Sequence, residues 1–396
     1  MAATTVIEGS VDAGFEPVRQ SFAENFTAFD ETGASCAVYV DGELKVDLWG
    51  GVADVSTGRP WADDTLVLVY SATKGATSVL CHRLAQEGLL DLDAPVAEYW
   101  PEFGENGKAG TTPRMLLSHE AGLPLLETAL PRDELLAGSR AADALAAQSP
   151  MWEPGTGYGY HALTFGWLLG ELVRRVTGDS LGAAFAAKVA VPLGLDFAIG
   201  LPDGDERRVA ALIDAAPPDP AAIEAIPDPD LRSRMIEALK PDSLFLKMLS
   251  TNGVLPTPSA EAWNDPAVWR AEQPAANGIT NARSLARMYA ACVGEVDGVR
   301  ILKDDTVSAA LLHHDVGPDR LVPVSSRHGT GFQLPDAIGP MLSDASFGHS
   351  GSGGALGFGD RRFNVAFGYA QNQLGGGLTG EQPRTMALVE ALRGCL

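Results

Sequence analysis

Short strand-like segments occupy the N-terminal part of the chain from about Gly33. Cys36-Ala-Val-Tyr-Val40 and Leu44-Lys-Val-Asp-Leu-Trp49 are rich in apolar and β-branched residues, which is typical of strands. An Asp41-Gly42 pair separates them, and this pair favours the tight turn of a β-hairpin. A further apolar run, Leu66-Val-Leu-Val-Tyr70, predicts a short buried strand.

The middle of the chain has the pattern of helices, and the C-terminal part returns to strands. Between residues 73 and about 325 apolar side chains recur mostly at helical spacing. Beyond that region the pattern predicts two strands, Gly354–Phe358 and Asn364–Ala370, joined by a turn at residues 359–361. A last helix is predicted over about Pro383 to Arg393.

Strand-rich ends around a helical middle predict one sheet that is built from both ends of the chain. We therefore expect an α/β (α+β) fold, with an antiparallel sheet flanked by helices and a mostly helical insertion. Residues 1–75 and 270–396 would form the sheet domain, and residues 76–269 the helical domain. A cleft between the two parts is the expected place for a binding site.

An S-x-x-K sequence, Ser71-Ala-Thr-Lys74, stands where the predicted strand 66–70 meets a predicted helix that runs to about Leu90. Ser71 would lie at the helix N-terminus, and Lys74 one turn later could reach its hydroxyl group. A desolvated neutral lysine can act as the base that turns a serine into a nucleophile. The alternative is that Ser71 caps the helix and Lys74 is a solvated lysine of the first turn.

Two glycine-rich segments are further candidates for lining a cleft. Residues 152–162 contain Tyr158 and Tyr160 and lead into a predicted helix from Leu163 to Val176. Residues 347–354 open the penultimate strand, and their glycines would let a ligand approach backbone N–H groups closely. The alternatives are tyrosines that serve packing or a turn, and an ordinary turn or β-bulge.

The composition gives no sign of a nucleic-acid or membrane partner. The chain has 396 residues, 45% of them hydrophobic, and a net charge of −22, which argues against nucleic acids and anionic membranes. The N-terminal residues lack the features of a signal peptide, and no apolar run approaches the roughly 18 residues of a membrane span. The cysteines are far apart, which suggests reduced thiols in a cytoplasmic protein: Cys36, Cys81, Cys292 and Cys395.

The sequence lacks the motifs of two other types of hydrolase, the α/β-hydrolases and the metal-dependent hydrolases. No serine has glycine at both the −2 and +2 positions, as a G-x-S-x-G nucleophile elbow requires. No H-E-x-x-H motif is present, and the histidines are dispersed apart from His313-His314, which we expect to be a solvated or capping pair. We expect no metal and no other cofactor.

Three segments together resemble the motifs of the serine β-lactamase/penicillin-binding-protein superfamily, and within it the family VIII carboxylesterases, which are similar to class C β-lactamases. In that superfamily S-x-x-K is followed by Y-x-N and then by K-T-G or H-x-G. The corresponding segments here are Ser71-Ala-Thr-Lys74, Tyr160-His-Ala162 and His349-Ser-Gly351. The resemblance covers about residues 30–375, and further matches support it: Leu90–Pro95, Leu116–Leu123 and Pro154–Thr156.

The resemblance implies a role for each motif residue. Ser71 would be the nucleophile, and Lys74 and Tyr160 would share the role of general base. The backbone N–H groups of Ser71 and Ser352 would form the oxyanion hole. The remaining motif positions would bind substrate: Tyr158, His349, Ser350 and Gly351.

Two departures from the motifs bear on the substrate. Ala162 replaces the usual asparagine, and His349 replaces the lysine that meets the substrate carboxylate in lactamases and peptidases. Both changes imply a site that is not built for β-lactams or for D-Ala-D-Ala peptides. We therefore expect a serine carboxylesterase that hydrolyses short-chain or small-alcohol esters through an acyl-enzyme.

Several alternatives stay open at this point. The same fold could support an acyltransferase, an amide hydrolase or D-amino-acid peptidase, or a non-catalytic ligand-binding relative. The intact set of Ser71, Lys74 and Tyr160 argues against the last of these. The expected partner is a small-molecule ester, and the sequence leaves open whether the protein is a monomer or a homodimer.

Overall fold

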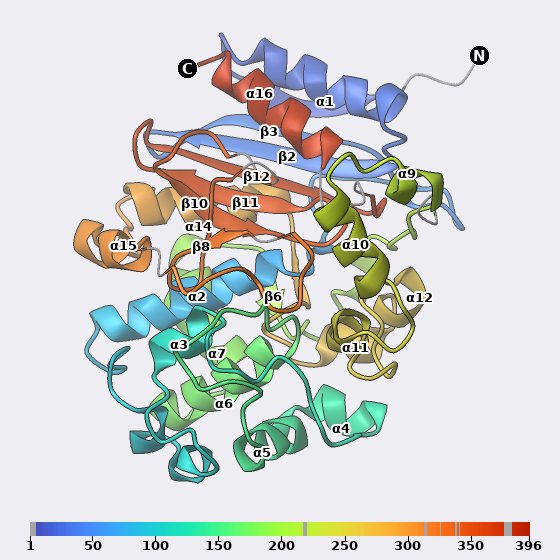
Figure 1. The fold of residues 1–396 in the computed structure, drawn as a ribbon. Helices are drawn as coiled ribbons and strands as arrows, with labels where there is room; N and C mark the ends of the chain where they lie inside the picture. Colours follow the sequence, from blue (N-terminus) through green and yellow to red (C-terminus); the bar gives the residue numbers. More distant parts are fainter. Residues whose placement is uncertain are drawn as a thin grey trace.

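Strands from both ends of the chain form one antiparallel sheet in the computed structural model of the protein (Figure 1). The structure describes residues 5–216, 220–312, 315–324, 326–336, 339, 341–375 and 382–396. Within these ranges the large sheet has nine strands, eight of them in the order β1-β3-β2-β12-β11-β10-β9-β8, with β4 paired to β3. The predicted fold class is confirmed. The predicted pair His313-His314 lies outside the described residues.

The two ends of the chain meet where β2 pairs with β12, in a register that runs from Val40 opposite Val365 to Ala34 opposite Gln371. The predicted hairpin joins β2 to β3, and its turn residues, Asp41 and Gly42, both have positive φ angles, of 51° and 79°. The strands of this sheet are β1 (Ile7–Val11), β2 (Gly33–Val40), β3 (Glu43–Asp54), β4 (Arg59–Pro60), β8 (Arg327–His328), β9 (Gln333–Leu334), β10 (Ser346–Ser350), β11 (Leu356–Asp360) and β12 (Val365–Gln371).

Helices cover both faces of the large sheet. The first and last helices, α1 (Glu16–Ala28) and α16 (Pro383–Arg393), lie side by side on one face (Figure 1). They enclose a core with the apolar side chains that the strands direct to this face, such as Phe358 and Phe367. The opposite face packs against α14 (Ala282–Val293). A sheet covered on both faces gives its central strands rigid positions, which suits a strand that carries part of a site.

The helical part of the chain contains a second, three-stranded sheet, of which the sequence predicted only the strand at Leu66–Tyr70. Its order is β5-β7-β6, with β5 (Val67–Leu68), β7 (Gly278–Thr280) and β6 (Phe197–Ile199). The helix α2 (Ala72–Gln86) begins directly after this sheet. Other helices of this part are α3 (Pro113–Leu117), α4 (Arg132–Ala137), α5 (Ser139–Ala147), α6 (Thr164–Thr177), α7 (Leu181–Phe185), α8 (Val191–Leu193), α9 (Pro220–Glu224), α10 (Pro229–Ala238), α11 (Leu244–Ser250), α12 (Ala260–Trp263) and α13 (Pro266–Arg270), and α15 (Asp304–Ala310) follows α14.

Three predicted boundaries are wrong by a few residues. The helix α2 ends at Gln86 rather than near Leu90, because Gly88 takes a positive φ angle of 74° and turns the chain. The turn after β11 spans residues 361–364 and not 359–361, since Asp360 still pairs with Val365. Residues 346–350 form a separate strand, β10, so the glycine-rich segment ends this strand instead of opening the next one.

The boundaries that were predicted between a sheet domain and a helical domain, at residues 75/76 and 269/270, remain a prediction. All four cysteines are free thiols. Among the described residues there is no helix with both the length and the apolar character that a membrane crossing requires.

Candidate active site

Ser71 stands on a tight turn between β5 and α2. The residue before it, Tyr70, has a φ angle of +44°, which is uncommon for a bulky side chain and indicates local strain. The side chain of Ser71 makes no capping hydrogen bond to the helix that follows. The capping alternative is therefore not what the structure shows, and Ser71 lines a cavity.

Lys74 is fully buried, with an exposed fraction of 0%, and not a solvated lysine of the first turn. Its Nζ lies 3.1 Å from the Ser71 Oγ. Two backbone carbonyl oxygens accept hydrogen bonds from the same amine, that of Ala162 at 2.8 Å and that of Ala275 at 2.9 Å. The amine thus has three oxygen neighbours; in its neutral form it has two N–H donors for the carbonyls and one lone pair that can accept the serine proton.

Burial lowers the pKa of Lys74 well below the usual range of lysine. Desolvation disfavours the charged ammonium form, and the polar partners of the amine are a hydroxyl and two neutral carbonyls. The rings of Tyr160 and Phe165 also lie near the amine, with centroids 4.9 and 5.6 Å from Nζ. These surroundings favour the neutral amine, and a lysine whose pKa is lowered in this way can act as a base.

Tyr160 shares this buried site with Lys74. Burial raises the pKa of Tyr160, the carboxylate of Asp319 raises it further, and a hydrogen bond with Ser71 acts in the opposite direction. The loop that carries Tyr160 is held by Asp319, whose carboxylate accepts the Tyr160 N–H at 3.1 Å. Burial thus favours the neutral form of both groups, and the Ser71 hydroxyl group is hydrogen-bonded to both.

The loop after β10 packs directly on the Ser71 turn. A Cβ atom on Gly351 would lie 2.0 Å from the carbonyl oxygen of Val69, so only glycine permits this approach. The Gly351 N–H donates to the Ala355 carbonyl at 2.7 Å, which closes the loop. Ser352 lies within this loop and lines the same cavity as Ser71. The backbone N–H groups of Ser71 and Ser352 thus belong to two segments that are fixed against each other.

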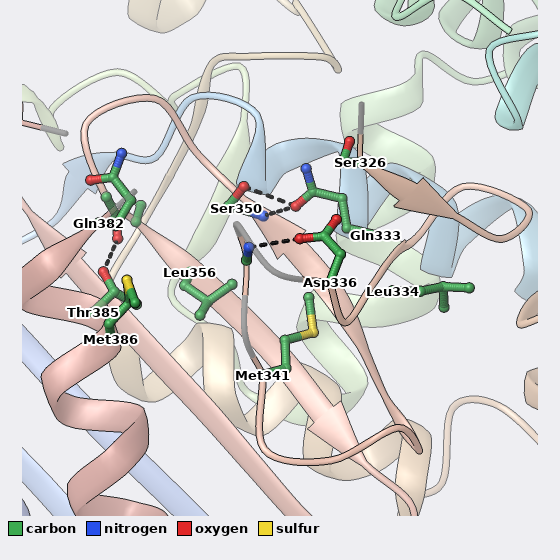
Figure 2. Close-up of a pocket in the computed structure, with 13 residues that line it drawn as sticks. Ser326, Gln333, Leu334, Asp336, Met341, Ser350, Leu356, Gln382, Thr385 and Met386 are labelled. Carbon is green, nitrogen blue, oxygen red and sulfur yellow. Dashed lines mark hydrogen bonds between the residues drawn. The ribbon is translucent and has the colours of Figure 1, made fainter. Parts of the chain in front are cut away.

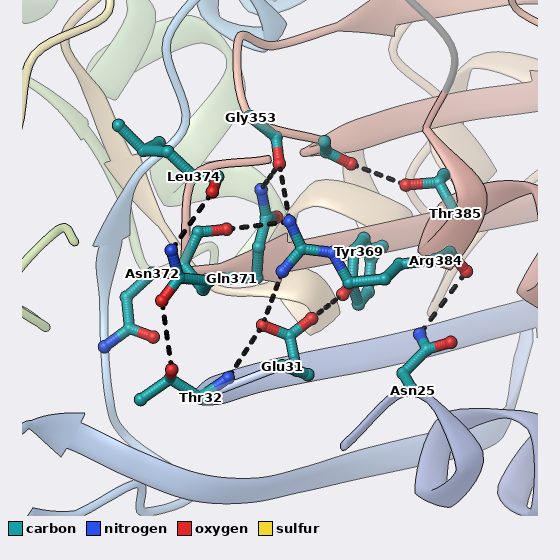
Figure 3. Close-up of polar contacts among 12 residues, drawn as sticks. Asn25, Glu31, Thr32, Gly353, Tyr369, Gln371, Asn372, Leu374, Arg384 and Thr385 are labelled. Carbon is teal, nitrogen blue, oxygen red and sulfur yellow. Dashed lines mark hydrogen bonds and ion pairs between the residues drawn. The ribbon is translucent and has the colours of Figure 1, made fainter. Parts of the chain in front are cut away.

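A buried ion pair holds the other end of this loop (Figure 3). Arg384, in the first turn of α16, pairs with Glu31 at 2.9 Å and donates to the Gly353 carbonyl at 3.3 Å. Gln371 donates to the same carbonyl at 2.6 Å, and the Tyr369 hydroxyl group bonds to Glu31. The network ties the first and last helical regions of the chain to the residue that follows Ser352.

We expect that Arg384→Ala destabilises the protein by about 3–5 kcal/mol, because the carboxylate of Glu31 would remain buried without its partner. Burial already raises the pKa of Glu31, and Arg384 counteracts that effect. Urea denaturation gives the free energy of unfolding. The control is Arg140→Ala, since Arg140 is exposed and its contact with Glu134 spans 3.6 Å. An equal loss in both variants would contradict the role given to the Arg384 ion pair.

Ser71 and Tyr160 line a cavity that we call the catalytic cavity. It has an empty volume of about 1160 Å³ and is partly open to solvent. Its wall contains one carboxyl group, from Asp319, and no Lys or Arg among the lining residues that the structure describes. The lining brings together several residues that the sequence predicted: Ser71, Tyr160, Ser350, Gly351 and Ser352. Lys74 adjoins them from behind Ser71.

Two predicted substrate-binding residues, His349 and Tyr158, do not line this cavity in the structure. His349 has an exposed fraction of 1%, because alternation along β10 turns its side chain inward, towards Gly75 and Tyr160. The His349 Nδ1 donates to the Ser350 carbonyl at 2.7 Å. Tyr158 is buried beside the rings of His119 and His328. Both side chains therefore lie in the protein interior next to the cavity wall and not on its surface.

Sequence reasoning missed Asp319, Gln333 and the Glu31–Arg384 pair. Asp319 accepts N–H groups from its own loop, those of Leu321 and Val322 at 2.8 and 2.9 Å, as well as that of Tyr160. Gln333, on β9, accepts two hydrogen bonds from Ser350. None of these residues belongs to a motif, and the contacts that tie them to the site reach segments further along the chain.

Comparisons with known proteins identify the family of the chain. The family model described as "Beta-lactamase" matches residues 22–391. The chain is 39% identical to the "Esterase/beta-lactamase LipL" of Mycobacterium tuberculosis, over 92% of this chain and 83% of that protein. Its structure is similar to that of a family VIII carboxylesterase, with a TM-score of 0.86 and 38% identity, covering 99% of this chain and 100% of the other.

A penicillin-binding protein homolog from Caulobacter crescentus is also similar in structure, with a TM-score of 0.81 and 34% identity over 99% of this chain and 100% of the other. A carboxylesterase and a penicillin-binding protein homolog thus share this architecture, so the architecture alone does not determine the substrate. The match of the family model over nearly the whole length settles the wider assignment: the chain belongs to the beta-lactamase family.

Proposed function

We propose that the protein is a serine carboxylesterase that hydrolyses short-chain or small-alcohol esters through an acyl-enzyme on Ser71. The observation that carries this proposal is the fully buried Lys74 amine, 3.1 Å from the Ser71 hydroxyl group, at a cavity whose described lining has no cationic side chain. The similarity to LipL and to a family VIII carboxylesterase supports the same activity.

Acylation uses the two neutral groups of the site. The Ser71 Oγ attacks the ester carbonyl and gives its proton to the Lys74 amine. The backbone N–H groups of Ser71 and Ser352 stabilise the oxyanion, and such donors contribute about 3–4 kcal/mol each to the transition state. Tyr160 then donates its phenolic proton to the oxygen of the leaving alcohol. The acyl-enzyme is left with a lysine cation and a tyrosine anion, which stabilise each other.

Deacylation returns both protons. The Tyr160 phenolate removes a proton from water, and the resulting hydroxide attacks the acyl-enzyme. As the bond to the Ser71 Oγ breaks, the Lys74 ammonium returns its proton to the serine. The products are one carboxylic acid and one alcohol, and the site regains its starting protonation state. No metal or organic cofactor takes part in these steps.

We expect esters to be hydrolysed much faster than β-lactams, by roughly a hundredfold or more in kcat/KM. The Asp319 carboxyl group in the wall disfavours a second negative charge, and no described lining residue offers a cation to a substrate carboxylate. A direct comparison of nitrophenyl butyrate with nitrocefin checks this, and nitrocefin turnover as fast as that of the ester would contradict the proposed specificity.

Acyl transfer would use the same acyl-enzyme, with an alcohol or amine in place of water. Adding an alcohol acceptor to the ester assay distinguishes the two reactions, because a transferase makes a new ester and a hydrolase releases the acid.

We also propose a cytoplasmic location, which the four free thiols support.

A further inference from the structure

A second hollow adjoins the catalytic cavity at the ends of β9 and β10 (Figure 2). It has an empty volume of about 600 Å³ that is partly open to solvent. Its lining shares four residues with the catalytic cavity: Ser326, Gln333, Ser350 and Gln382. The two spaces are therefore neighbours with a common polar border, and we call the second one the side chamber.

Beyond this border the described part of the wall is mainly apolar, and its one carboxyl group, that of Asp336, accepts the Gly339 N–H at 2.8 Å and the Arg327 N–H at 3.0 Å. Met341 and Leu356 are buried side chains of this wall, and Met386 forms part of its rim with an exposed fraction of 37%. The Leu334 side chain points away from the chamber into the main core (Figure 2). The Thr385 hydroxyl group donates to the Gly354 carbonyl at 2.7 Å, so its O–H donor is already engaged within the protein. Such a wall suits an alkyl or aryl group. No lysine or arginine is among its described lining residues, so it offers no cation to an anionic ligand.

The border itself is held in a fixed conformation (Figure 2). The Gln333 Oε1 accepts hydrogen bonds from both the backbone N–H and the hydroxyl group of Ser350, at 2.7 and 2.8 Å. Ser350 is also held by His349, whose Nδ1 donates to its carbonyl. A pre-formed border of this kind costs a ligand little ordering energy.

The position of Tyr160 indicates which half of an ester would face the side chamber. Its ring centroid lies 6.4 Å from that of His349 and 6.3 Å from that of His328. Each histidine adjoins a border residue, since Ser350 follows His349 in β10 and the Ser326 hydroxyl lies 2.7 Å from the His328 Nε2. Tyr160 is the proton donor to the leaving oxygen in the proposed mechanism, so the alcohol lies on the same side as this border.

We propose that the side chamber binds the apolar alkyl or aryl part of the alcohol in the ester substrate. The chamber thereby sets a preference for esters of longer or aromatic alcohols, while the acyl group stays in the catalytic cavity near Leu163 and Ala276. This inference rests on the proposed esterase function. Met386 is the accessible specificity-determining position, because it lies at the rim on a regular helix.

The test compares two ester series with the wild type and with Met386→Trp, which fills the chamber. One series keeps the acetyl group and changes the alcohol from ethanol to hexanol, and the other keeps ethanol and lengthens the acid to hexanoate. We expect Met386→Trp to lower kcat/KM for hexyl acetate by roughly tenfold or more, because several methylene groups lose their apolar contacts. Ethyl acetate and ethyl hexanoate should stay within about twofold of the wild type.

Met151→Trp is the matched control, since Met151 is 44% exposed and lines neither cavity. Met386→Ala gives a second variant that enlarges the chamber, and it should shift the preference towards bulkier alcohols such as benzyl alcohol. An effect of Met386→Trp on the acyl series instead, or on neither series, would overturn the assignment. A wild type that hydrolysed none of these esters would contradict the proposed function itself, which separates the two failures.

Discussion

Ser71→Ala is expected to lower ester hydrolysis by roughly 10⁵-fold, as the loss of a nucleophile does in other serine hydrolases. The structure gives a physical reason to expect an intact fold, because the Ser71 side chain makes no capping hydrogen bond to α2. Lys74 would keep both of its carbonyl acceptors. Initial rates with nitrophenyl butyrate measure the loss, and a thermal melt reports on the fold.

The control for this variant is Ser308→Ala, at an exposed serine on α15 whose hydroxyl donates to the Asp304 carbonyl. It should keep activity within about twofold of the wild type. Substantial residual activity in Ser71→Ala, at the level of Ser308→Ala, would mean that another residue is the nucleophile.

Lys74→Ala and Tyr160→Phe should each lower kcat/KM by roughly 10³-fold or more, and the double variant should be little worse than either. The reason is that each catalytic cycle needs both proton transfers: Lys74 takes and returns the serine proton, and Tyr160 gives a proton to the alcohol and regains one from water. Removing either group therefore stops the cycle. Kinetics on the two single variants and the double variant give the coupling free energy. Losses that simply add would contradict the shared mechanism.

The Lys74 variant needs a control for stability, because its removal leaves the Ala162 and Ala275 carbonyl groups without their buried donor. Lys74→Met keeps most of the side-chain volume and separates loss of the base from loss of packing. A thermal melt of both variants shows whether the activity is measured on folded protein. Recovery of activity in Lys74→Met would contradict the role of Lys74 as a base.

The sequence predicted those parts of the molecule that depend on local pattern or on motif order. The hairpin at Asp41-Gly42 follows from turn chemistry, and the last helix has the predicted bounds, Pro383–Arg393. The fold class followed from strand-like segments at both ends. Ser71, Lys74 and Tyr160 were chosen because their motifs occur in order, and the structure brings the three side chains together.

Other features depend on contacts that no local pattern contains. The three-stranded sheet pairs β5 with β7, which lies about two hundred residues further along the chain, and its strands have only two or three residues each. Asp319 and Gln333 act through hydrogen bonds to distant segments. The inward direction of His349 depends on the register of β10, which the sequence analysis did not recognise as a strand of its own.

The most direct test of the central claim is to identify the residue that becomes covalently modified. We would treat the wild type with a fluorophosphonate, measure the intact mass, and map the adduct by peptide mass spectrometry. We predict one adduct per chain, located on Ser71, and much slower labelling of Lys74→Ala because the serine has lost its base. An adduct on any other serine, or labelling of Ser71→Ala at the wild-type rate, would contradict the account.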